Sequence, residues 1–310
     1  MFSTLDSNFA ENSLKPMHKK KSCLFIINPI SGLGKQKIMP ELIDKFLDKQ
    51  KYTFEISFTE YAGHAPKITA QHKDEFDVVV AVGGDGTVNE VATALVDTET
   101  CMGVIPLGSG NGFARYLDIS TQAARAIQQL NDSYAQKFDT GLLNDKPFFN
   151  VSGVGFDGQI SKTFAEQLKR GYMTYARCVV EEFQTYTPKK FRYEVEGKTI
   201  EEDYFLIAFA NTTQYGNNAI IAPHATANDG LLDIVLISPF PPIHLPTFTM
   251  MALFKSLHRS PYVKIIRADK FSLENEEQAP IHIDGEYLCD DRWINIRTKP
   301  GSLKVMTPIK

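Results

Sequence analysis

The chain has 310 residues, about twice a typical domain length, so we expect two domains. Its 43% hydrophobic and 23% charged residues are ordinary for a globular protein and exclude collagen-like, low-complexity and wholly disordered chains. The formal net charge is −4, from 33 Lys and Arg against 37 Asp and Glu. That balance argues against a protein that neutralises nucleic-acid phosphates, so we expect no nucleic-acid partner.

The sequence carries no segment that approaches the roughly 18 consecutive apolar residues of a membrane-spanning helix. Residues 1–18 are polar and lack the apolar core of a signal peptide, so we interpret them as a flexible N-terminal tail. The cysteines are scattered without a paired motif, which favours reduced thiols over a disulfide framework. These features predict a soluble cytoplasmic protein.

The first half alternates strands with helices. In chain order we predict strands over 23–27, 53–59, 77–82 and 102–107, and helices over 38–47, 66–76, 88–95 and 113–116. The strands are almost continuously apolar, which is typical of a parallel sheet covered on both faces. We therefore predict an α/β nucleotide-binding domain, doubly wound with a mostly parallel sheet, over residues 19–140.

The second half is dominated by short strands. We predict them over 148–154, 191–195, 204–210, 231–237, 263–268, 270–273, 281–284 and 293–297, with a helix over 160–185 interrupted by Gly171. Strands that follow strands indicate an antiparallel β-sandwich domain with inserted helices, which we place over residues 141–298. We expect residues 299–310 to return to the N-terminal domain.

A glycine-rich loop, Gly83 to Asn89, follows the third predicted strand and opens a helix. Glycines at that position let the backbone approach a phosphate, whose charge the helix N-terminus favours. Asp85 would repel a bare phosphate, so its presence implies Mg²⁺ or a proton to be moved. The alternative is a tight turn with Asp85 and Thr87 as helix caps. Three glycines around an acid exceed what a turn needs, so we favour a functional loop.

Two further loops follow strands of the same predicted sheet. Residues 28–35 follow the first strand and residues 106–115 follow the fourth, and each is a Gly, Ser and Asn turn that opens a helix. Neither has the Gly-Lys-Ser/Thr of a Walker A loop. Each loop alone is a turn, but together the three loops predict a nucleotide site.

The sequences NPISGLG, GGDGTVNEV and PLGSGNGFAR together resemble the diacylglycerol-kinase catalytic family, which also includes sphingosine and ceramide kinases. Residues 153–157, 228–233 and 283–286 stand in the order found in soluble bacterial lipid kinases. The resemblance covers roughly residues 20–308. GGDGT alone is shared with NAD kinases and loosely with phosphofructokinases, so the specificity comes from the combination.

The resemblance implies an ATP site built from these loops. In the family, the first loop lines the site, a threonine ending the second strand contacts the nucleotide, and the GGDGT loop wraps the phosphates. Carried over to this chain, the ATP-binding residues are Asn28, Pro29, Ser31, Gly32, Thr59, Gly83, Gly84, Asp85, Gly86, Thr87, Asn89, Gly108, Ser109 and Asn111. The family usually has threonine where this chain has Ser109, and serine keeps the side-chain hydroxyl of threonine.

The resemblance also implies catalytic acids. Asp284-Gly285-Glu286 is similar to the family's proposed base segment, in which Glu286 would accept a proton with help from Asp284, while Asp85 organises the metal. From the residues alone, Asp-Gly between alternating stretches is a strong hairpin signal, and a turn and a base segment are compatible. We expect His282, on the preceding strand, to be packed or exposed rather than catalytic.

A structural Mg²⁺ in bacterial members is held by one aspartate and two nearby carbonyls. These positions map to Asp229, Thr226 and Leu231, and oxygen ligands suit Mg²⁺. Spacing alone favours a plain turn before a strand.

The resulting hypothesis is an ATP-dependent lipid kinase that uses Mg-ATP, with ATP and Mg²⁺ as cofactors and a diacylglycerol-like or sphingoid-like acceptor. The alternatives are an NAD kinase and a non-catalytic nucleotide- or lipid-binding homologue. A lipid presented at a membrane surface requires transient peripheral contact with the inner membrane, and members of the family commonly form homodimers. An apolar stripe at Leu245, Phe248, Met251, Leu253, Phe254 and Leu257 is usually core, but part of it would suit a lipid groove or a bilayer.

Overall fold

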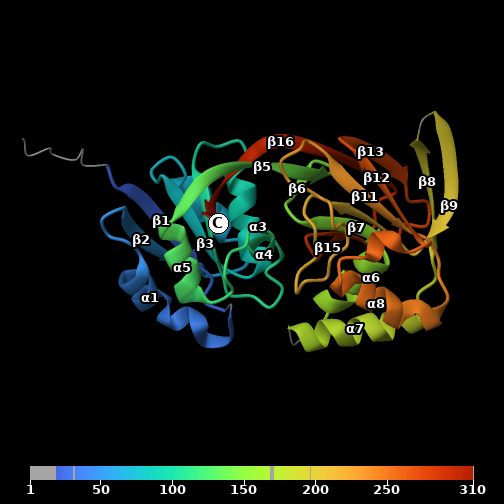
Figure 1. The fold of residues 1–310 in the computed structure, drawn as a ribbon, viewed down its shortest axis with the longest axis horizontal. Coiled ribbons are helices and arrows are strands. Elements are labelled where there is room, and N and C mark those ends of the chain that lie inside the picture. Colours follow the sequence, from blue (N-terminus) through green and yellow to red (C-terminus); the bar gives the residue numbers. More distant parts are fainter. Residues whose placement is uncertain (1–18, 31, 168–170, 196, 310) are drawn as a thin grey trace, which may run out of the picture.

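The computed structural model describes residues 19–30, 32–167, 171–195 and 197–309, so the predicted tail at 1–18 lies outside the described residues. Two halves lie side by side along the long axis of the molecule (Figure 1). The N-terminal half holds four parallel strands in the order β2-β1-β3-β4. They are β1 (Lys21–Ile27), β2 (Tyr52–Phe58), β3 (Val78–Gly83) and β4 (Cys101–Pro106).

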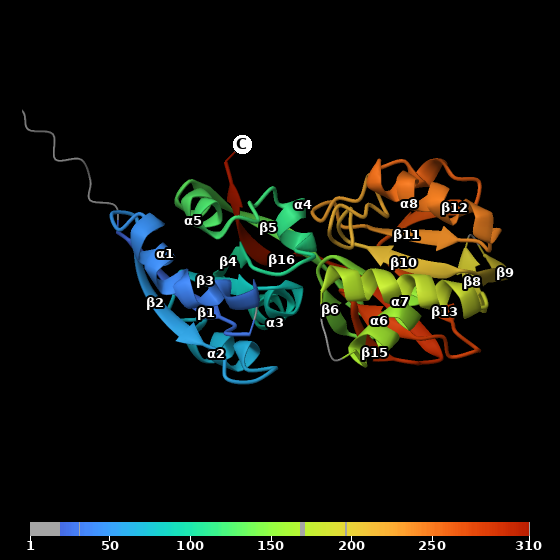
Figure 2. The ribbon, with the colours of Figure 1, turned by 90° about the horizontal axis from the view of Figure 1, so that it is seen from below.

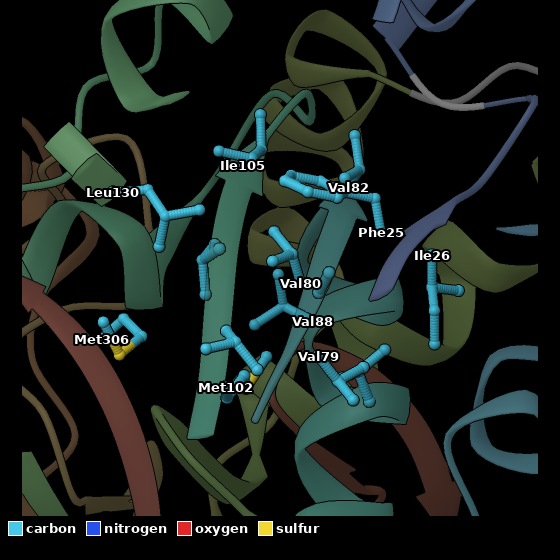
Figure 3. Packing of buried hydrophobic residues seen from close by; sticks show 14 of the residues in the cluster. Phe25, Ile26, Val79, Val80, Val82, Val88, Met102, Ile105, Leu130 and Met306 are labelled. Carbon is cyan, nitrogen blue, oxygen red and sulfur yellow. The ribbon is translucent and has the colours of Figure 1, made fainter. Parts of the chain in front are cut away.

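Helices cover both faces of this sheet, as predicted for a doubly wound domain. They are α1 (Met39–Phe46), which follows the 3-10 segment η1 (Gly32–Ile38), α2 (Ala65–His72), α3 (Asp85–Leu95), α4 (Gly112–Tyr116) and α5 (Ala123–Asn131). Helix α1 contacts α5 on one side of the sheet, and α2 contacts α3 on the other (Figure 2). The apolar strand residues pack between these layers, with Phe25, Val80 and Ile105 fully buried (Figure 3).

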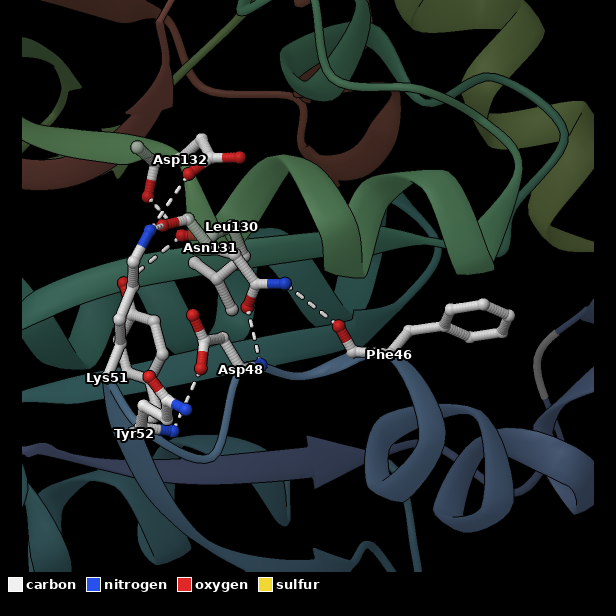
Figure 4. A network of polar contacts seen from close by, with 9 residues as sticks. Phe46, Asp48, Lys51, Tyr52, Leu130, Asn131 and Asp132 are labelled. Atoms are coloured by element: carbon white, nitrogen blue, oxygen red, sulfur yellow. Dashed lines mark hydrogen bonds and ion pairs between the residues drawn. The ribbon is translucent and has the colours of Figure 1, made fainter.

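Asn131 fixes the end of α5 against the loop between α1 and β2 (Figure 4). Its side-chain amide donates to the carbonyl of Phe46 at 2.8 Å, and its side-chain oxygen accepts from the N–H of Asp48 at 2.9 Å. The Lys51 ammonium also donates to the Asn131 carbonyl at 2.8 Å. These contacts satisfy backbone groups at the end of α1, so the outer layer of the domain is held by polar contacts as well as by apolar packing.

The C-terminal half contains an antiparallel six-stranded sheet in the order β12-β11-β10-β7-β14-β15. Its strands are β7 (Val151–Gly155), β10 (Leu206–Ala210), β11 (Leu232–Ile237), β12 (Val263–Ala268), β14 (Ile281–Ile283) and β15 (Glu286–Cys289). One face packs on the second sheet through a shared apolar core, and the other is covered by helices. The covering elements are α6 (Phe156–Ala165), α7 (Tyr172–Thr185), α8 (Leu245–Leu253) and the 3-10 segments η2 (Pro242–His244) and η3 (Leu257–Arg259).

The second sheet is ten-stranded and continues from the N-terminal half. Its remaining strands are β5 (Ser133–Leu143), β6 (Lys146–Phe148), β8 (Lys189–Val195), β9 (Lys198–Tyr204), β13 (Lys270–Glu274) and β16 (Trp293–Pro308). Strand β16 pairs with β13 in one half and, through Val305 opposite Met102, with β4 in the other. The predicted domain limits at 140 and 298 thus fall inside β5 and β16, which connect the halves as paired strands (Figure 1).

The fold class is confirmed, and several element limits need correction. The helix predicted over 160–185 is two helices, and Gly171, with φ 132°, immediately precedes α7. The strand predicted over 293–297 extends to residue 308. Strands β5, β6, β9 and β15 are not in the sequence prediction, apart from Phe148 and Tyr204 at the ends of β6 and β9. Strand β9 is mostly polar, and β6 and β15 have only three and four residues, so none of these three gives an alternating pattern.

Candidate active site

A cleft of about 670 Å³ lies between the two halves. One wall is formed by loops at the carboxyl ends of β1 to β4, and the other by residues of α6, α7, the loop 215–219 and the β14–β15 turn. Ligands of parallel α/β sheets bind at the carboxyl ends of the strands, and this volume is ordinary for a small-molecule site. The cleft is therefore the candidate active site.

The structure brings most of the predicted nucleotide residues to this cleft. Those that line it are Asn28, Pro29, Thr59, Gly84, Asp85, Gly86, Thr87, Gly108 and Ser109. Gly83, Asn89 and Asn111 belong to the same loops and helices but are not among the residues that line the cleft. Gly32 begins η1, and Ser31 lies outside the described residues.

The glycine-rich loops contact one another backbone to backbone. A Cβ on Gly108 would stand 2.7 Å from the Cα of Gly84, so this approach requires glycine. The N–H of Leu107 donates to the carbonyl of Gly83 at 2.7 Å, and the amide of Asn28 donates to the Thr87 hydroxyl at 3.1 Å. The loops after β1, β3 and β4 therefore form one continuous wall.

The carboxylate of Asp85 links two of these loops. One oxygen accepts the N–H of Gly112 at 2.8 Å and the other accepts the N–H of Asn111 at 2.8 Å, at the start of α4. Burial raises the pKa of Asp85, and these two donors and the charge of Arg115 oppose the rise. In this geometry Asp85 fixes the position of the 108–112 loop, whereas its role toward a metal stays a prediction.

Asp284 connects the two halves of the protein. Its residue adopts a left-handed conformation, φ 49°, in the turn between β14 and β15. The carboxylate accepts the N–H of Phe149 at 2.9 Å, the N–H of Asn150 at 2.8 Å and the side-chain amide of Asn89 at 2.7 Å. Because Asn89 belongs to α3, this carboxylate bridges the cleft. Residues 284–286 therefore form a hairpin turn that also holds the Asp284 carboxylate in a fixed position.

Burial raises the pKa of Asp284 to about 6 in spite of these donors. The folded protein therefore binds this proton more tightly than the unfolded chain does. The contribution of Asp284 to the free energy of unfolding is thus lost as the pH rises from about 4 to about 6.

We expect Asn89→Ala to raise the pKa of Asp284 further, by about one to two units, since a hydrogen bond to a charged group is worth ~1.5–3 kcal/mol. NMR titration of the Asp284 side-chain carbon, assigned by its loss in Asp284→Asn, measures the shift. Thr93→Ala is the matched control, because Thr93 contacts only the other end of the Asn89 amide, at 3.4 Å. An unchanged midpoint in Asn89→Ala would contradict the role of this bond.

Glu286 extends from the same turn toward the nucleotide loops. It is exposed, and its Oε1 lies 2.8 Å from where a Cβ on Gly86 would stand. Burial, with a contribution from the charge of Glu286, raises the pKa of nearby Glu90. The oxygens of Asp284 are already used as acceptors, so Glu286 is the acid of this turn that is open to the cleft.

His282 is packed, one of the two placements expected for it, and it takes part in a hydrogen-bond network. It is buried and lines the cleft. Its Nδ1 accepts the N–H of Gly285 at 3.1 Å, so Nε2 carries the proton and donates to Asp157 at 3.0 Å. Asp157 also accepts the hydroxyl proton of Tyr215 at 2.9 Å, and burial and the charge of Asp157 raise the pKa of Tyr215 well above 10. This network supports the turn that carries Glu286.

Further lining residues were not identified from the sequence. They include Glu60, Tyr61, Glu90, Asn150, Asp157, Ser161, Phe164, Tyr175 and Tyr215. Tyr61 stacks on His64 with ring centroids 4.5 Å apart. It follows the carboxyl end of the second strand, and that position was the sequence signal that could have identified it as a cleft residue. Tyr175 and Phe164 belong to helices of the other half and had no sequence signal.

The predicted Mg²⁺ position lies away from the cleft. Asp229 accepts the N–H of Leu231 at 3.0 Å and forms an ion pair with Arg267, while Thr226 donates to the carbonyl of His224 at 3.3 Å. The Arg267 guanidinium thus contacts one carboxylate oxygen of Asp229 and the N–H of Leu231 contacts the other, and the Mg²⁺ ligands at Asp229, Thr226 and Leu231 stay a prediction. Among the described residues, no group of three or more His, Cys, Asp or Glu is placed to hold a metal.

Comparisons with known proteins cover both halves. Residues 22–143 match the diacylglycerol kinase catalytic domain, and residues 150–307 match the YegS C-terminal NAD kinase beta sandwich-like domain. The chain is 28% identical over 287 residues to the diacylglycerol kinase of Bacillus subtilis strain 168, covering 89% of this chain and 94% of that one. It is 30% identical over 237 residues to the "probable lipid kinase YegS-like" of Pseudomonas aeruginosa strain UCBPP-PA14, covering 75% and 77%.

A crystal structure of a diacylglycerol kinase from Bacillus anthracis strain Sterne has the same fold. Its TM-score is 0.72 at 20% sequence identity, covering 93% of this chain and 97% of that one. Because both halves match in sequence and the glycine-rich loops line one cleft, the chain belongs to the diacylglycerol kinase catalytic-domain family of lipid kinases.

Proposed function

We propose that this protein is an ATP-dependent lipid kinase, which transfers the γ-phosphoryl group of Mg-ATP to a lipid hydroxyl. The observation that carries the proposal is the cleft, in which the glycine-rich loops of one half stand opposite Glu286 of the other. Phosphoryl transfer requires mainly positioning and charge neutralisation, which such a two-sided cleft supplies.

The residues divide the chemistry between the two walls. The loops at Asn28, Gly84 to Thr87 and Ser109 bind the nucleotide phosphates. The acceptor oxygen attacks the γ-phosphorus as the bond to the β,γ-bridging oxygen breaks, and ADP leaves. Glu286 takes the hydroxyl proton, provided its carboxylate lies within ~3 Å of that oxygen in the ternary complex. His282 and Asp284 position the turn that carries Glu286.

The acceptor enters along the wall of the C-terminal half. That wall offers apolar surface from Val151, Phe164 and Ala219 around the polar groups of Asp157 and Tyr215. A lipid with a hydroxylated headgroup and acyl or alkyl chains matches this mixed lining. The names of the relatives favour a diacylglycerol-like acceptor, with a sphingoid-like lipid as the second choice.

A direct assay tests the proposal. Purified protein with Mg²⁺, γ-labelled ATP and mixed micelles of diacylglycerol, monoacylglycerol or sphingoid base is expected to give a labelled lipid. Label transferred to NAD instead, yielding NADP, would identify an NAD kinase. ATP binding without any labelled product across the panel would identify a non-catalytic homologue, and either outcome would overturn the proposal.

A further inference from the structure

The surface helix α8 carries large apolar residues on both of its faces, and it exposes Thr247 and Thr249 as well. Its inner face is anchored by buried Phe248, whose ring stacks on Phe240 with centroids 4.1 Å apart. Its outer face, with the flanking turns, exposes large side chains at Ile243 (81%), Met250 (51%), Leu253 (48%) and Phe254 (71%). Ile243, Leu253 and Phe254 stand seven, three and four residues from Met250, and these spacings put all four on one side of the helix.

A helix with large apolar residues on opposite faces is normally buried in a core or in a membrane. Helix α8 instead covers the outer side of the six-stranded sheet and lies at the surface of the molecule (Figures 1 and 2). No helix in the described part of the chain is long and apolar enough to cross a membrane. The outer face of α8 therefore fits a ligand that lies against it.

The charge around α8 indicates which ligand. Residues 234–268 contain no Asp or Glu but include Lys255, Arg259 and Lys264, besides Arg267, which is paired with Asp229 and Asp233. Three cations of this segment are thus left for an external anion, in a chain of net charge −4. Lys255 and Arg259 are exposed directly after the apolar face. An apolar face bordered by basic residues is complementary to an anionic lipid surface. A second copy of the chain would bring the same positive segment against itself.

The position of α8 links it to the cleft. The N–H of Ile220 donates to the carbonyl of Ala252 in α8 at 3.1 Å, and the adjacent Ala219 lines the cleft. Helix α7, whose Tyr175 also lines the cleft, lies on the same side of the molecule in Figure 1 and exposes Met173 and Val180. A bilayer touching α8 therefore lies beside the lipid-side wall of the cleft.

We propose that α8 with its flanks, residues 243–259, is a membrane-docking surface that lies in the headgroup region of an anionic leaflet. Ile243, Met250, Leu253 and Phe254 enter the acyl boundary, and Lys255 and Arg259 contact the anionic headgroups. The inference rests on the proposed function in one respect: docking would serve to bring the cleft to a lipid acceptor. Docking itself requires no turnover.

Vesicle flotation of the full chain without ATP tests the surface. Wild-type protein is expected to bind phosphatidylcholine–phosphatidylglycerol vesicles better than pure phosphatidylcholine vesicles. Leu253→Gln with Phe254→Gln is expected to lower the partition coefficient at least about tenfold, because each side chain loses apolar burial in the bilayer. Lys255→Gln with Arg259→Gln is expected to remove the preference for anionic vesicles.

Trp293→Gln is the matched control, since Trp293 is 57% exposed on β16, in the sheet on the opposite side of the sandwich. It should float like the wild type, and circular dichroism should show all variants folded. Equal flotation of wild type and Leu253→Gln/Phe254→Gln would overturn the inference. The inference would also be overturned if the wild type formed a dimer and bound no vesicles, and if Leu253→Gln/Phe254→Gln converted that dimer to a monomer. Flotation that depends on α8, without any lipid phosphorylation, would overturn the proposed function and leave docking in place.

Discussion

Replacing Glu286 by Gln is expected to lower the rate of phosphoryl transfer about 10²- to 10⁴-fold, the usual contribution of a general base. Glutamine keeps the size of the side chain and its approach to Gly86, but it cannot take the hydroxyl proton. The loops proposed to bind ATP are on the other wall of the cleft and remain unchanged. We therefore expect kcat to fall while the ATP dissociation constant, measured by calorimetry, stays within about twofold.

Glu90→Gln is the matched control for this variant. Glu90 also lines the cleft, but its carboxylate accepts the N–H of Gly63 at 3.0 Å on the nucleotide side. We expect Glu90→Gln to lower the rate much less than Glu286→Gln does. A wild-type rate in Glu286→Gln would exclude Glu286 as the base. Loss of ATP binding with an unchanged kcat would assign the carboxylate to the nucleotide instead.

The first half of the fold was predictable because its signals are local. Each strand of the parallel sheet is a short apolar run, and the runs at β1, β3 and β4 end in a turn with glycine. The second half was less predictable, because β9 is an exposed edge strand with the sequence KTIEEDY. In β16, register shifts between Lys299 and Leu303 where Pro300 and Gly301 interrupt the pattern, so its continuation to β4 depends on pairing partners far away in the sequence.

The candidate site divides in the same way. The loops were found from their motifs and the Asp284–Glu286 turn from the family resemblance, and the structure places them around one cleft. The contacts that orient them join residues distant in the chain, such as Asn89 and Asp284, which are 195 residues apart. His282 on a short alternating strand gave no sign that it would donate to Asp157. Such pairs depend on how the two halves pack, and a motif does not contain that information.

Replacing Asp85 by Asn is expected to damage ATP binding and turnover together, which distinguishes it from Glu286→Gln. An amide keeps one acceptor oxygen but turns its NH₂ toward the N–H of Asn111 or Gly112, so one buried donor loses its partner. That costs ~1–3 kcal/mol and displaces the loop that packs on Gly84. A misplacement of about 1 Å near reacting groups costs about 10²-fold, so kcat/KM should fall at least that much while the protein stays folded.

Metal dependence separates the two roles open to Asp85. If the carboxylate holds the 108–112 loop, as its two N–H partners indicate, then raising Mg²⁺ or substituting Mn²⁺ will not restore Asp85→Asn. If it organises the metal of Mg-ATP, a higher metal concentration should recover part of the rate, because the lost ligand weakens metal binding that mass action can offset. Asp132→Asn, at an exposed ion pair with Lys51, controls for removal of one charge and should behave like the wild type. Wild-type ATP affinity in Asp85→Asn would contradict both roles.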